Sequence, residues 1–393
     1  MTIPTYDAIV IGAGPAGLAA AAELERRGVD AIIVERAETV GASWRGHYDR
    51  LHLHTVRWLS QLPGLRIPAD EGRYVSRDGV VRYLDRYAAH HQLDVRTGVS
   101  VTRLDRDRDA WLVQSPEGDI RARQVVVATG YNHTPLIPDW PGKDAFGGEL
   151  LHAASYRNGA PYAGRDVLVV GSGNTGAEIA VDLAERGAAR VRLAFRTPPH
   201  IFRRELNGVP SQITGVLARH LPAWLADGLT EPVRRRTVPD LSAHGLPDPG
   251  KGAYKRAKQG DIPILDVGLI EAIQDGRVQP VRTVTGFDGD KVLLASGDTI
   301  EPDAVIVATG YRRGLEPLVG HLGVLDARGN PTVSRARTAP NAPALRFIGF
   351  TNPISGMFRE LGIDARRIAR AVERELRATD VRLAVGQPVP AQS

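Results

Sequence analysis

The feature that most constrains this chain is a glycine-rich segment that occurs twice, each time between an apolar, β-branched run and an alanine-rich stretch. The first copy, GAGPAG, occupies residues 12–17, and the second, GSGNTG, occupies residues 171–176. Each copy predicts a helix that ends in charged residues followed by a glycine. This glycine is Gly28 in the first copy and Gly187 in the second. The spacing from the first glycine to the helix-ending glycine is the same in both copies. The repeat therefore predicts two strand–turn–helix units of one kind.

Each residue of the first copy has a physical reason to be there. Gly12 allows the tight turn, Gly14 lets the backbone approach a pyrophosphate, and Gly17 lets the helix pack on the strand. The free N–H groups at the helix start favour phosphate oxygens. Glu35 follows the next apolar run and is placed to accept hydrogen bonds from a ribose. We expect the first unit to bind FAD.

The second copy differs where the adenosine ribose of a nucleotide is expected. Its next strand, predicted over 191–195, ends in Arg196 and Thr197 and carries no carboxylate. A carboxylate selects a free 2′-hydroxyl, whereas an arginine pairs with a 2′-phosphate. We therefore expect the second unit to bind NADPH. The alternative is that Arg196 is an ordinary solvent-exposed arginine at a strand end.

A second repeat follows each unit. VVVATGY spans residues 125–131, and VIVATGY spans residues 305–311. One such strand is expected to close each sheet, with small residues at its end where the chain passes a bound dinucleotide or simply turns. The prediction is an α/β protein with two dinucleotide-binding Rossmann-like domains, as in glutathione-reductase-like flavoproteins. The expected domain bounds are 1–160 and 286–393 for the FAD-binding domain, and 161–285 for the NADPH-binding domain.

Composition excludes several chemistries. The chain of 393 residues has no cysteine, which removes thiol nucleophiles, dithiol redox chemistry and thiolate metal sites, and it has no H-E-x-x-H spacing. The net charge of +5 without aromatic–basic interleaving argues against nucleic acid as a partner. The uncharged stretch 8–22 contains helix-breaking glycines and is too short for a membrane span, so a cytoplasmic protein is expected. No metal is expected, and the oligomeric state is left open.

Residues 200–261 fit neither repeat and are expected to form an inserted region of the NADPH-binding domain that discriminates between substrates. The region is basic, which suggests an acidic substrate. Its apolar positions recur at helical spacing, although Pro222 interrupts them. That face could pack in the core, line a channel, touch a membrane or bind a partner. The positions are Leu217, Leu221, Trp224, Leu225 and Leu229.

The chain resembles the flavin-containing monooxygenases, and within them the bacterial and YUCCA-type, auxin-forming branch. FGGELLHAASY, from Phe146 to Tyr156, fits that family's F-x-G-x-x-x-H-x-x-x-Y fingerprint, with His152 at its histidine position. The related Baeyer–Villiger enzymes carry tryptophan at the last position of the fingerprint. Segments 48–54 and 350–360 are also similar to segments of this family. His54 stands where many members of the family have asparagine beside the flavin.

The resemblance implies a monooxygenase that reduces FAD with NADPH, captures dioxygen as a flavin hydroperoxide and inserts one oxygen atom into a small-molecule substrate. The expected reactions are N- or S-oxygenation, or oxidative decarboxylation of a 2-oxo acid. One alternative is Baeyer–Villiger oxygenation of a ketone, and another is a flavin reductase that passes electrons to a protein acceptor. A non-catalytic binding protein is disfavoured because two intact glycine motifs have little use there.

The sequence and the resemblance together predict one catalytic residue, His54, and a set of cofactor-binding residues. The cofactor-binding set is Gly12, Gly14, Pro15, Ala16, Gly17, Glu35, Arg36, Trp44, Arg45, His54, Thr55, Val101, Ala128, Thr129, Gly130, Tyr131, His152, Tyr156, Gly171, Ser172, Gly173, Asn174, Thr175, Gly176, Arg196, Thr197, Thr309, Gly310 and Asn352.

Overall fold

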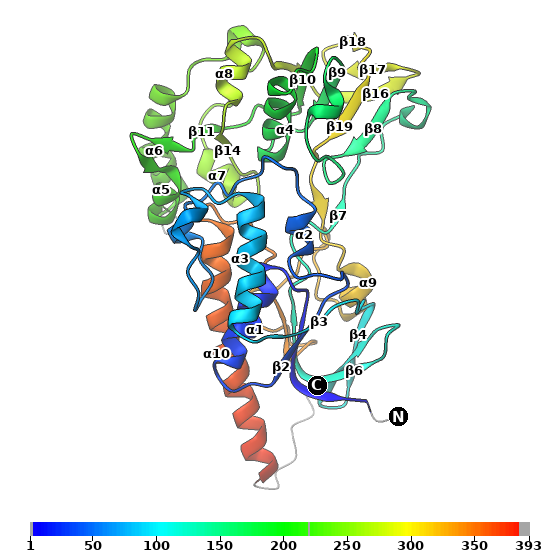
Figure 1. Cartoon of the computed structure of the whole chain (residues 1–393), viewed down its shortest axis with the longest axis vertical. Helices are drawn as coiled ribbons and strands as arrows, with labels where there is room; N and C mark the ends of the chain where they lie inside the picture. The colour runs from blue at the N-terminus through cyan, green and yellow to red at the C-terminus, as the bar shows by residue number, and fades with distance from the viewer. Residues whose placement is uncertain (1–2, 219–220, 385–393) are drawn as a thin grey trace. The chain divides into compact units, whose positions relative to one another are not determined.

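A computed structural model describes residues 3–218 and 221–384 of the chain (Figure 1). The chain forms two compact units, and it passes between them more than once. The first unit contains residues 1–45, 57–134 and 311–393, and the second contains residues 46–56 and 135–310. The short elements β7 (Thr134–Pro135) and β20 (Tyr311–Arg312) lie at the boundaries.

The first unit is built on a seven-stranded sheet in the order β3-β2-β1-β6-β5-β4, with β21 also paired to β6. The strands β1, β2, β3, β6 and β21 are parallel, and β4 and β5 add an antiparallel hairpin. Because β1 lies between β2 and β6, its residues from Ala8 to Ile11 are buried, which explains the continuous apolar run. The bounds are β1 (Thr5–Ile11), β2 (Ala31–Val34), β3 (Asp94–Arg96), β4 (Arg103–Asp107), β5 (Ala110–Gln114), β6 (Ile120–Val127) and β21 (Leu345–Phe347).

Helices cover this sheet, and α1 packs against the long C-terminal helix α10. The charged residues of α10 recur at helical spacing around a buried stripe that includes Ala365, Ile368 and Val372. The buried ring of Trp111 and the apolar side of the strands form the core of the unit. The helices are α1 (Pro15–Glu25), α2 (Ala42–Arg45), α3 (Arg77–His90), α9 (Glu316–Val319) and α10 (Met357–Ala384), with short turns η1 (Arg57–Leu59), η2 (Ala69–Glu71) and η6 (Gly320–Leu322).

The second unit repeats the arrangement with a five-stranded parallel sheet in the order β15-β10-β9-β19-β8. Helix α4 follows β9 as α1 follows β1, and a small antiparallel sheet of β16, β17 and β18 precedes β19. The bounds are β8 (Glu149–His152), β9 (Asp166–Val170), α4 (Asn174–Glu185), β10 (Arg190–Phe195), α8 (Leu269–Gln274), β15 (Gln279–Arg282), β16 (Val284–Asp288), β17 (Lys291–Leu294), β18 (Thr299–Ile300) and β19 (Ala304–Val307), with turns η3 (Lys143–Ala145) and η4 (Ala160–Tyr162).

The boundaries differ from those that the sequence predicted at residues 160 and 285. Residues 135–160 and 286–310 belong to the second unit, because β19 pairs with β9 on one side and with β8 on the other. The repeat identified β19 as a closing strand, but nothing in the sequence showed that β8 would lie beside it. Pairing between distant strands is decided by tertiary contacts rather than by local pattern.

The inserted region 200–261 forms short helices and strand pairs within the second unit. Three of its predicted apolar-face residues are exposed, with 73% of Leu217, 75% of Trp224 and 61% of Leu229 accessible. The interpretation that this face packs in the core is therefore wrong for these three residues. Pro222 lies between the two helices α5 and α6 and does not interrupt a single helix. The elements are β11 (Ile201–Arg203), β12 (Glu205–Leu206), β13 (Val209–Pro210), α5 (Ser211–Ala218), α6 (Ala223–Thr237), η5 (Ser242–His244) and α7 (Ala253–Lys258). Strand β11 pairs with β14 (Ile264–Asp266), which follows the region.

Candidate functional site: two glycine turns

The first glycine motif forms a tight turn between β1 and α1. The Gly12 N–H donates to the carbonyl oxygen of Val34 over 2.8 Å, and the φ of Gly12 is +107°. A Cβ on Gly12 would lie 2.7 Å from the carbonyl oxygen of Ala128. A Cβ on Gly17 would overlap the carbonyl oxygen of Gly12. Backbone conformation therefore requires glycine at Gly12, and close packing requires it at both positions.

Glu35 follows β2 and supports this turn with both carboxylate oxygens. Its Oε2 accepts a hydrogen bond from the Ala13 N–H at 2.7 Å, and its Oε1 accepts one from the Ala37 N–H at 2.9 Å. A carboxylate oxygen has two lone pairs, so each oxygen keeps acceptor capacity for a ribose hydroxyl. The sequence predicted that Glu35 binds a ribose. The structure shows that Glu35 also orients the glycine turn.

The second motif has the same geometry between β9 and α4. The Gly171 N–H donates to the carbonyl oxygen of Ala194 over 3.0 Å, and the φ of Gly171 is +121°. A Cβ on Gly171 would overlap the Ala308 carbonyl, and one on Gly176 would overlap the Gly171 carbonyl. The turn, the neighbouring strand end and the close helix contact all recur. The duplicated spacing in the sequence corresponds to a duplicated structure.

The middle glycine of each motif indicates that the turns leave room for a group outside the protein chain. Gly14 and Gly173 are the N-cap residues of α1 and α4, with φ of −80° and −90°, so their backbone does not require glycine. A Cβ on either residue would meet no atom within 4 Å. Gly228 also has a negative φ and open surroundings, but it lies inside helix α6 rather than at a turn. Neither strain nor packing explains these two glycines, whereas a bound pyrophosphate would, and the turns therefore fit the dinucleotides.

The ends of the two closing strands differ. The buried hydroxyl of Thr129, beside the first turn, has no hydrogen-bond partner among the described residues. The hydroxyl of Thr309, at the equivalent position, donates to the carbonyl oxygen of Leu136. Gly130 and Gly310 both have positive φ, of 94° and 89°. The unpaired Thr129 hydroxyl is a second sign that the first turn is shaped for a polar ligand, because buried hydroxyls normally have a partner.

The other residues predicted at the first turn have varied surroundings. Trp44 packs edge-on against Phe358 with ring centroids 5.7 Å apart, and Arg45 pairs with Asp85 at 2.6 Å. Arg36 contacts His133, and Tyr131 lies under the guanidinium of Arg313. Val101 packs on the core of the unit. Asn352 is exposed in the segment before α10. Pro15 and Ala16 begin α1. All of them lie in the first unit. The residues that the structure brings directly together are those of the glycine turn and those at the end of β6, Ala128 and Thr129.

The fingerprint residues His152 and Tyr156 are buried in the core of the second unit. The Nδ1 of His152 accepts from the Ala154 N–H at 3.1 Å, and its Nε2 lies 3.1 Å from the Gly310 carbonyl oxygen. The Tyr156 hydroxyl donates to Asp182 on α4 at 2.6 Å. These contacts position the strand end and α4. That the two residues bind a cofactor stays a prediction.

The His152 contacts lead to a prediction about acid stability. Burial lowers the pKa of His152, with the Gly310 hydrogen bond opposing the shift, so the fold favours neutral imidazole. A lowered pKa means that the unfolded chain binds more protons, so stability falls as pH decreases below about 6.5. We expect H152Q, which keeps a donor but cannot titrate, to lose less thermal stability between pH 7.5 and pH 5.5 than the wild type. Parallel pH dependences of the melting temperature would contradict this.

His54 lies in the second unit rather than the first. Its Nε2 is 2.7 Å from Oε1 of Glu178 on α4, and its buried Nδ1 has no hydrogen-bond partner in the described part of the chain. Buried Tyr48 has a raised pKa because of burial and then the charge and hydrogen bond of Glu178, and it also hydrogen-bonds Thr175. His54 and Thr55 therefore belong to a segment that supports the second glycine turn. A catalytic role for His54 stays a prediction.

Sequence reasoning missed the contacts that support the second glycine turn and helix α4. Asn174 was expected at the cofactor, but its side chain donates to the Pro263 carbonyl at 3.2 Å and accepts from the Leu265 N–H at 2.8 Å. Glu178 and Asp182 were not singled out, although both are buried. Two acidic residues four positions apart on the buried face of a short apolar helix are the signal that could have identified them.

Arg196 and Thr197 are exposed just after β10. Arg196 has no ion pair or side-chain hydrogen bond with any residue that the structure describes, so its guanidinium is available. Ser172 is half-buried within the second turn. Two sheets with parallel centres, each with a glycine turn that leads into a helix, define a protein with two dinucleotide-binding domains.

Comparison with known proteins identifies the family. A family model described as pyridine nucleotide-disulphide oxidoreductase matches residues 9–207. The chain is 33% identical over 378 residues to the probable indole-3-pyruvate monooxygenase YUCCA3 of Arabidopsis thaliana, covering 93% of this chain and 86% of the relative. It is 36% identical over 327 residues to the indole-3-pyruvate monooxygenase YUCCA1 of Oryza sativa subsp. japonica, covering 82% and 80%.

A solved structure supports the same family assignment. A doubly substituted flavin monooxygenase from Stenotrophomonas maltophilia superposes with a TM-score of 0.75 at 25% identity, over 95% of this chain and all of that chain. The chain belongs to the flavin-dependent monooxygenases within the pyridine nucleotide-disulphide oxidoreductase family. It is an enzyme that uses FAD and NADPH and acts with dioxygen on a small molecule. None of the helices in residues 3–218 and 221–384 has the length and apolar composition needed to cross a membrane.

Proposed function

We propose that the enzyme oxidatively decarboxylates a 2-oxo acid with an aromatic side chain. The observation that carries this proposal is the similarity, over most of both chains, to proteins named indole-3-pyruvate monooxygenases. The reaction would convert the 2-oxo acid, dioxygen, NADPH and a proton into the shortened carboxylic acid, carbon dioxide, water and NADP⁺. One dioxygen atom enters the new carboxylate and the other leaves in water. N- or S-oxygenation is the second candidate, because the fingerprint ends in Tyr156 and not in the tryptophan of the Baeyer–Villiger enzymes.

In this proposal FAD is held at Gly12, Gly14 and Gly17 of the first unit, and NADPH at the matching glycines of the second. FAD supplies the redox chemistry with electrons from NADPH. The chain contributes orientation. Glu35 aligns the Ala13 N–H. The starts of α1 and α4 present unpaired N–H groups to phosphate oxygens. Gly14 and Gly173 leave the space that the phosphates need.

Labelled dioxygen tests the reaction class. With ¹⁸O₂ and an aromatic 2-oxo acid, we expect one labelled atom in the product carboxylate and one carbon dioxide released for each NADPH oxidised. An enzyme acting on nitrogen or sulfur would place the label on that atom without carbon dioxide. A ketone-oxygenating enzyme would form an ester, and a reductase would leave every product unlabelled. Any of these three results with turnover would overturn the decarboxylation proposal.

The exposed guanidinium of Arg196 tests the assignment of NADPH to the second turn. R196A should raise the KM for NADPH about tenfold or more, while the KM for NADH changes little, because only NADPH carries the 2′-phosphate. Steady-state kinetics with both nucleotides measures the difference. R190A is the matched control, since Arg190 lies at the opposite end of β10 and pairs with Asp166 at 3.4 Å. Equal changes for both nucleotides would remove the proposed role of Arg196.

We also propose a cytoplasmic location. The uncharged stretch that could be mistaken for a leader forms β1 and the start of α1, and its residues from Ala8 to Ile11 lie in the core of the first unit. Removing it would take away a central strand. Fractionation of cells should recover the enzyme with cytoplasmic markers, and recovery from another compartment would contradict the proposal.

A further inference from the structure

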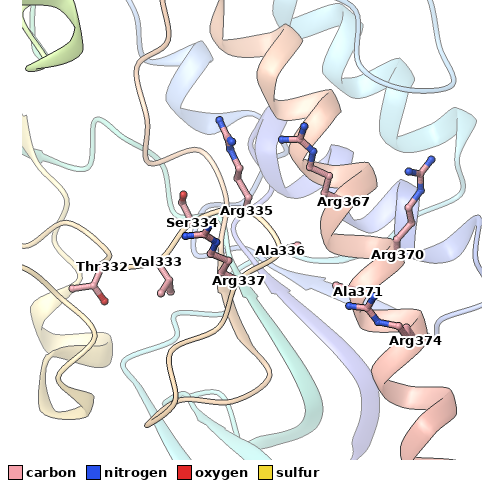
Figure 2. A pocket seen from close by; sticks show the side chains of 10 residues that line it. All are labelled: Thr332, Val333, Ser334, Arg335, Ala336, Arg337, Arg367, Arg370, Ala371 and Arg374. Atoms are coloured by element: carbon pink, nitrogen blue, oxygen red, sulfur yellow. The ribbon is translucent and has the colours of Figure 1, made fainter. Parts of the chain in front are cut away.

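The first unit contains a cavity of about 630 Å³ whose charged lining consists of arginines (Figure 2). One wall is the loop 332–337, and the other is the middle of α10. We call this cavity the arginine groove. Figure 2 shows two of these arginines on the loop and three on the neighbouring turns of α10. Its arginines are Arg335, Arg337, Arg367, Arg370 and Arg374.

The two walls are joined by a buried arginine that does not itself line the groove. The Arg346 side chain is fully buried, and its Nε donates to the carbonyl oxygen of Ala336 in the loop at 3.3 Å. Its Nη1 donates to Gln124 of β6 at 2.6 Å, and its Nη2 donates to Glu375 of α10. Three elements therefore meet at one guanidinium. The backbone of both walls is therefore held in place by the fold, although the arginine side chains that line the groove are exposed.

The charge of the arginine groove is poorly balanced by the protein itself. Asp364 lies 3.5 Å from Arg335 and 3.7 Å from Arg367. The guanidinium groups of Arg337, Arg370 and Arg374 have no ion pair or hydrogen bond with any described residue. Like charges lining one cavity repel each other, so a bound anion would relieve a cost that the protein otherwise carries. Arg335 also has a φ of 65°, an uncommon conformation for a residue with a side chain.

The groove lies away from the first glycine turn. Arg27, just beyond the C-terminal end of α1, pairs at 2.6 Å with Glu373, the neighbour of Arg374. The glycine turn is at the other end of α1, an 11-residue helix about 16 Å long. An anion in the groove is therefore not the pyrophosphate of a dinucleotide held at Gly12 to Gly17.

We propose that the arginine groove binds a small anion that carries two or three linked phosphate groups. Three unpaired guanidiniums on facing walls can each offer paired N–H donors to phosphate oxygens, and one phosphate is too small to reach all of them across this volume. The volume suits a small molecule, and no aromatic side chain lines it to stack a nucleobase. The ligand class is inorganic or simple organic di- and triphosphate. This site does not depend on the identity of the oxidised substrate.

Calorimetric titration with inorganic triphosphate tests this proposal. The enzyme is loaded with FAD and saturated with NADP⁺, so that both glycine turns are filled, and ionic strength is held constant. We expect saturable binding of triphosphate, and binding of orthophosphate at least about tenfold weaker. The triple variant R337A/R370A/R374A should bind triphosphate at least about 30-fold more weakly. Its flavin content should match the wild type, because these side chains are exposed.

A matched variant separates the site from the effect of net charge. R86A/R236A/R328A removes three exposed arginines elsewhere, whose guanidinium groups have no ion pair or hydrogen bond with a described residue. It should bind triphosphate as the wild type does. R370Q provides a milder change and should weaken binding about three- to tenfold. Absence of triphosphate binding, or equal weakening in the two triple variants, would overturn the proposal.

Discussion

G14V should give folded protein without flavin, and G173V should give folded, yellow protein that no longer binds NADPH. Valine is tolerated by the backbone at both positions, because φ is −80° and −90° with ψ near 180°. The added Cβ meets no atom within 4 Å outside the neighbouring residues, so the valine side chain would extend into the space assigned to the phosphates. We expect each substitution to weaken its own nucleotide at least about 100-fold, since a blocked pyrophosphate loses all its contacts with the turn.

Absorbance near 450 nm, far-ultraviolet circular dichroism and NADPH titration together measure these effects. G228V is the control, because Gly228 has the same open surroundings and no positive φ but lies inside helix α6 and belongs to neither glycine motif. It should keep both nucleotides. A G14V protein that is fully loaded with FAD would refute the assignment of the first turn, and unchanged NADPH affinity in G173V would refute that of the second.

G17A and G176A should prevent the accumulation of folded protein. Helix propensity alone favours alanine over glycine by about 1 kcal/mol inside a helix, so a local argument predicts stabilisation. The structure predicts the opposite sign, because a Cβ at either position would overlap the carbonyl oxygen of the first glycine in its motif. Backbone cannot move aside as a side chain can, so the helix would have to separate from the strand. The expected cost is several kcal/mol, comparable to the whole stability of a domain.

Soluble yield and the melting temperature measure this second effect. G228A is the matched control within a helix, since its Cβ meets nothing within 4 Å, and it should leave the melting temperature unchanged or slightly raised. If G17A or G176A also melted at or above the wild-type temperature, the close contact between helix and strand would not exist as described.

The local units could be predicted because each depends on residues that are close in the chain. The strand, turn and helix at Gly12 to Gly17, and the matching unit at Gly171 to Gly176, were confirmed. The second repeat does form the strands β6 and β19, but each lies inside its sheet, paired on both sides, and does not close it. The fold class was confirmed by the family and by the solved structure. The roles of the individual site residues in binding stay predictions.

The directions of side chains could not be predicted from the same patterns. His152 and Tyr156 were assigned to a cofactor because they complete a family fingerprint, yet Gly310 and Asp182 take up their polar atoms. Asn174 similarly faces the segment at Pro263. In each case the partner is distant in sequence, or lies on another element, and so no local spacing reveals it.

The sequence by itself determined that there are two dinucleotide-binding units, because turn conformation, helix ends and strand burial are properties of short segments that glycine, alanine and valine specify directly. Only the tertiary structure decided where each unit ends, which hydroxyl stays unpaired at Thr129, and that loop 332–337 meets α10 to gather five arginines. These features arise from contacts between segments far apart in the chain, and their energies depend on packing and burial rather than on the residues taken in order.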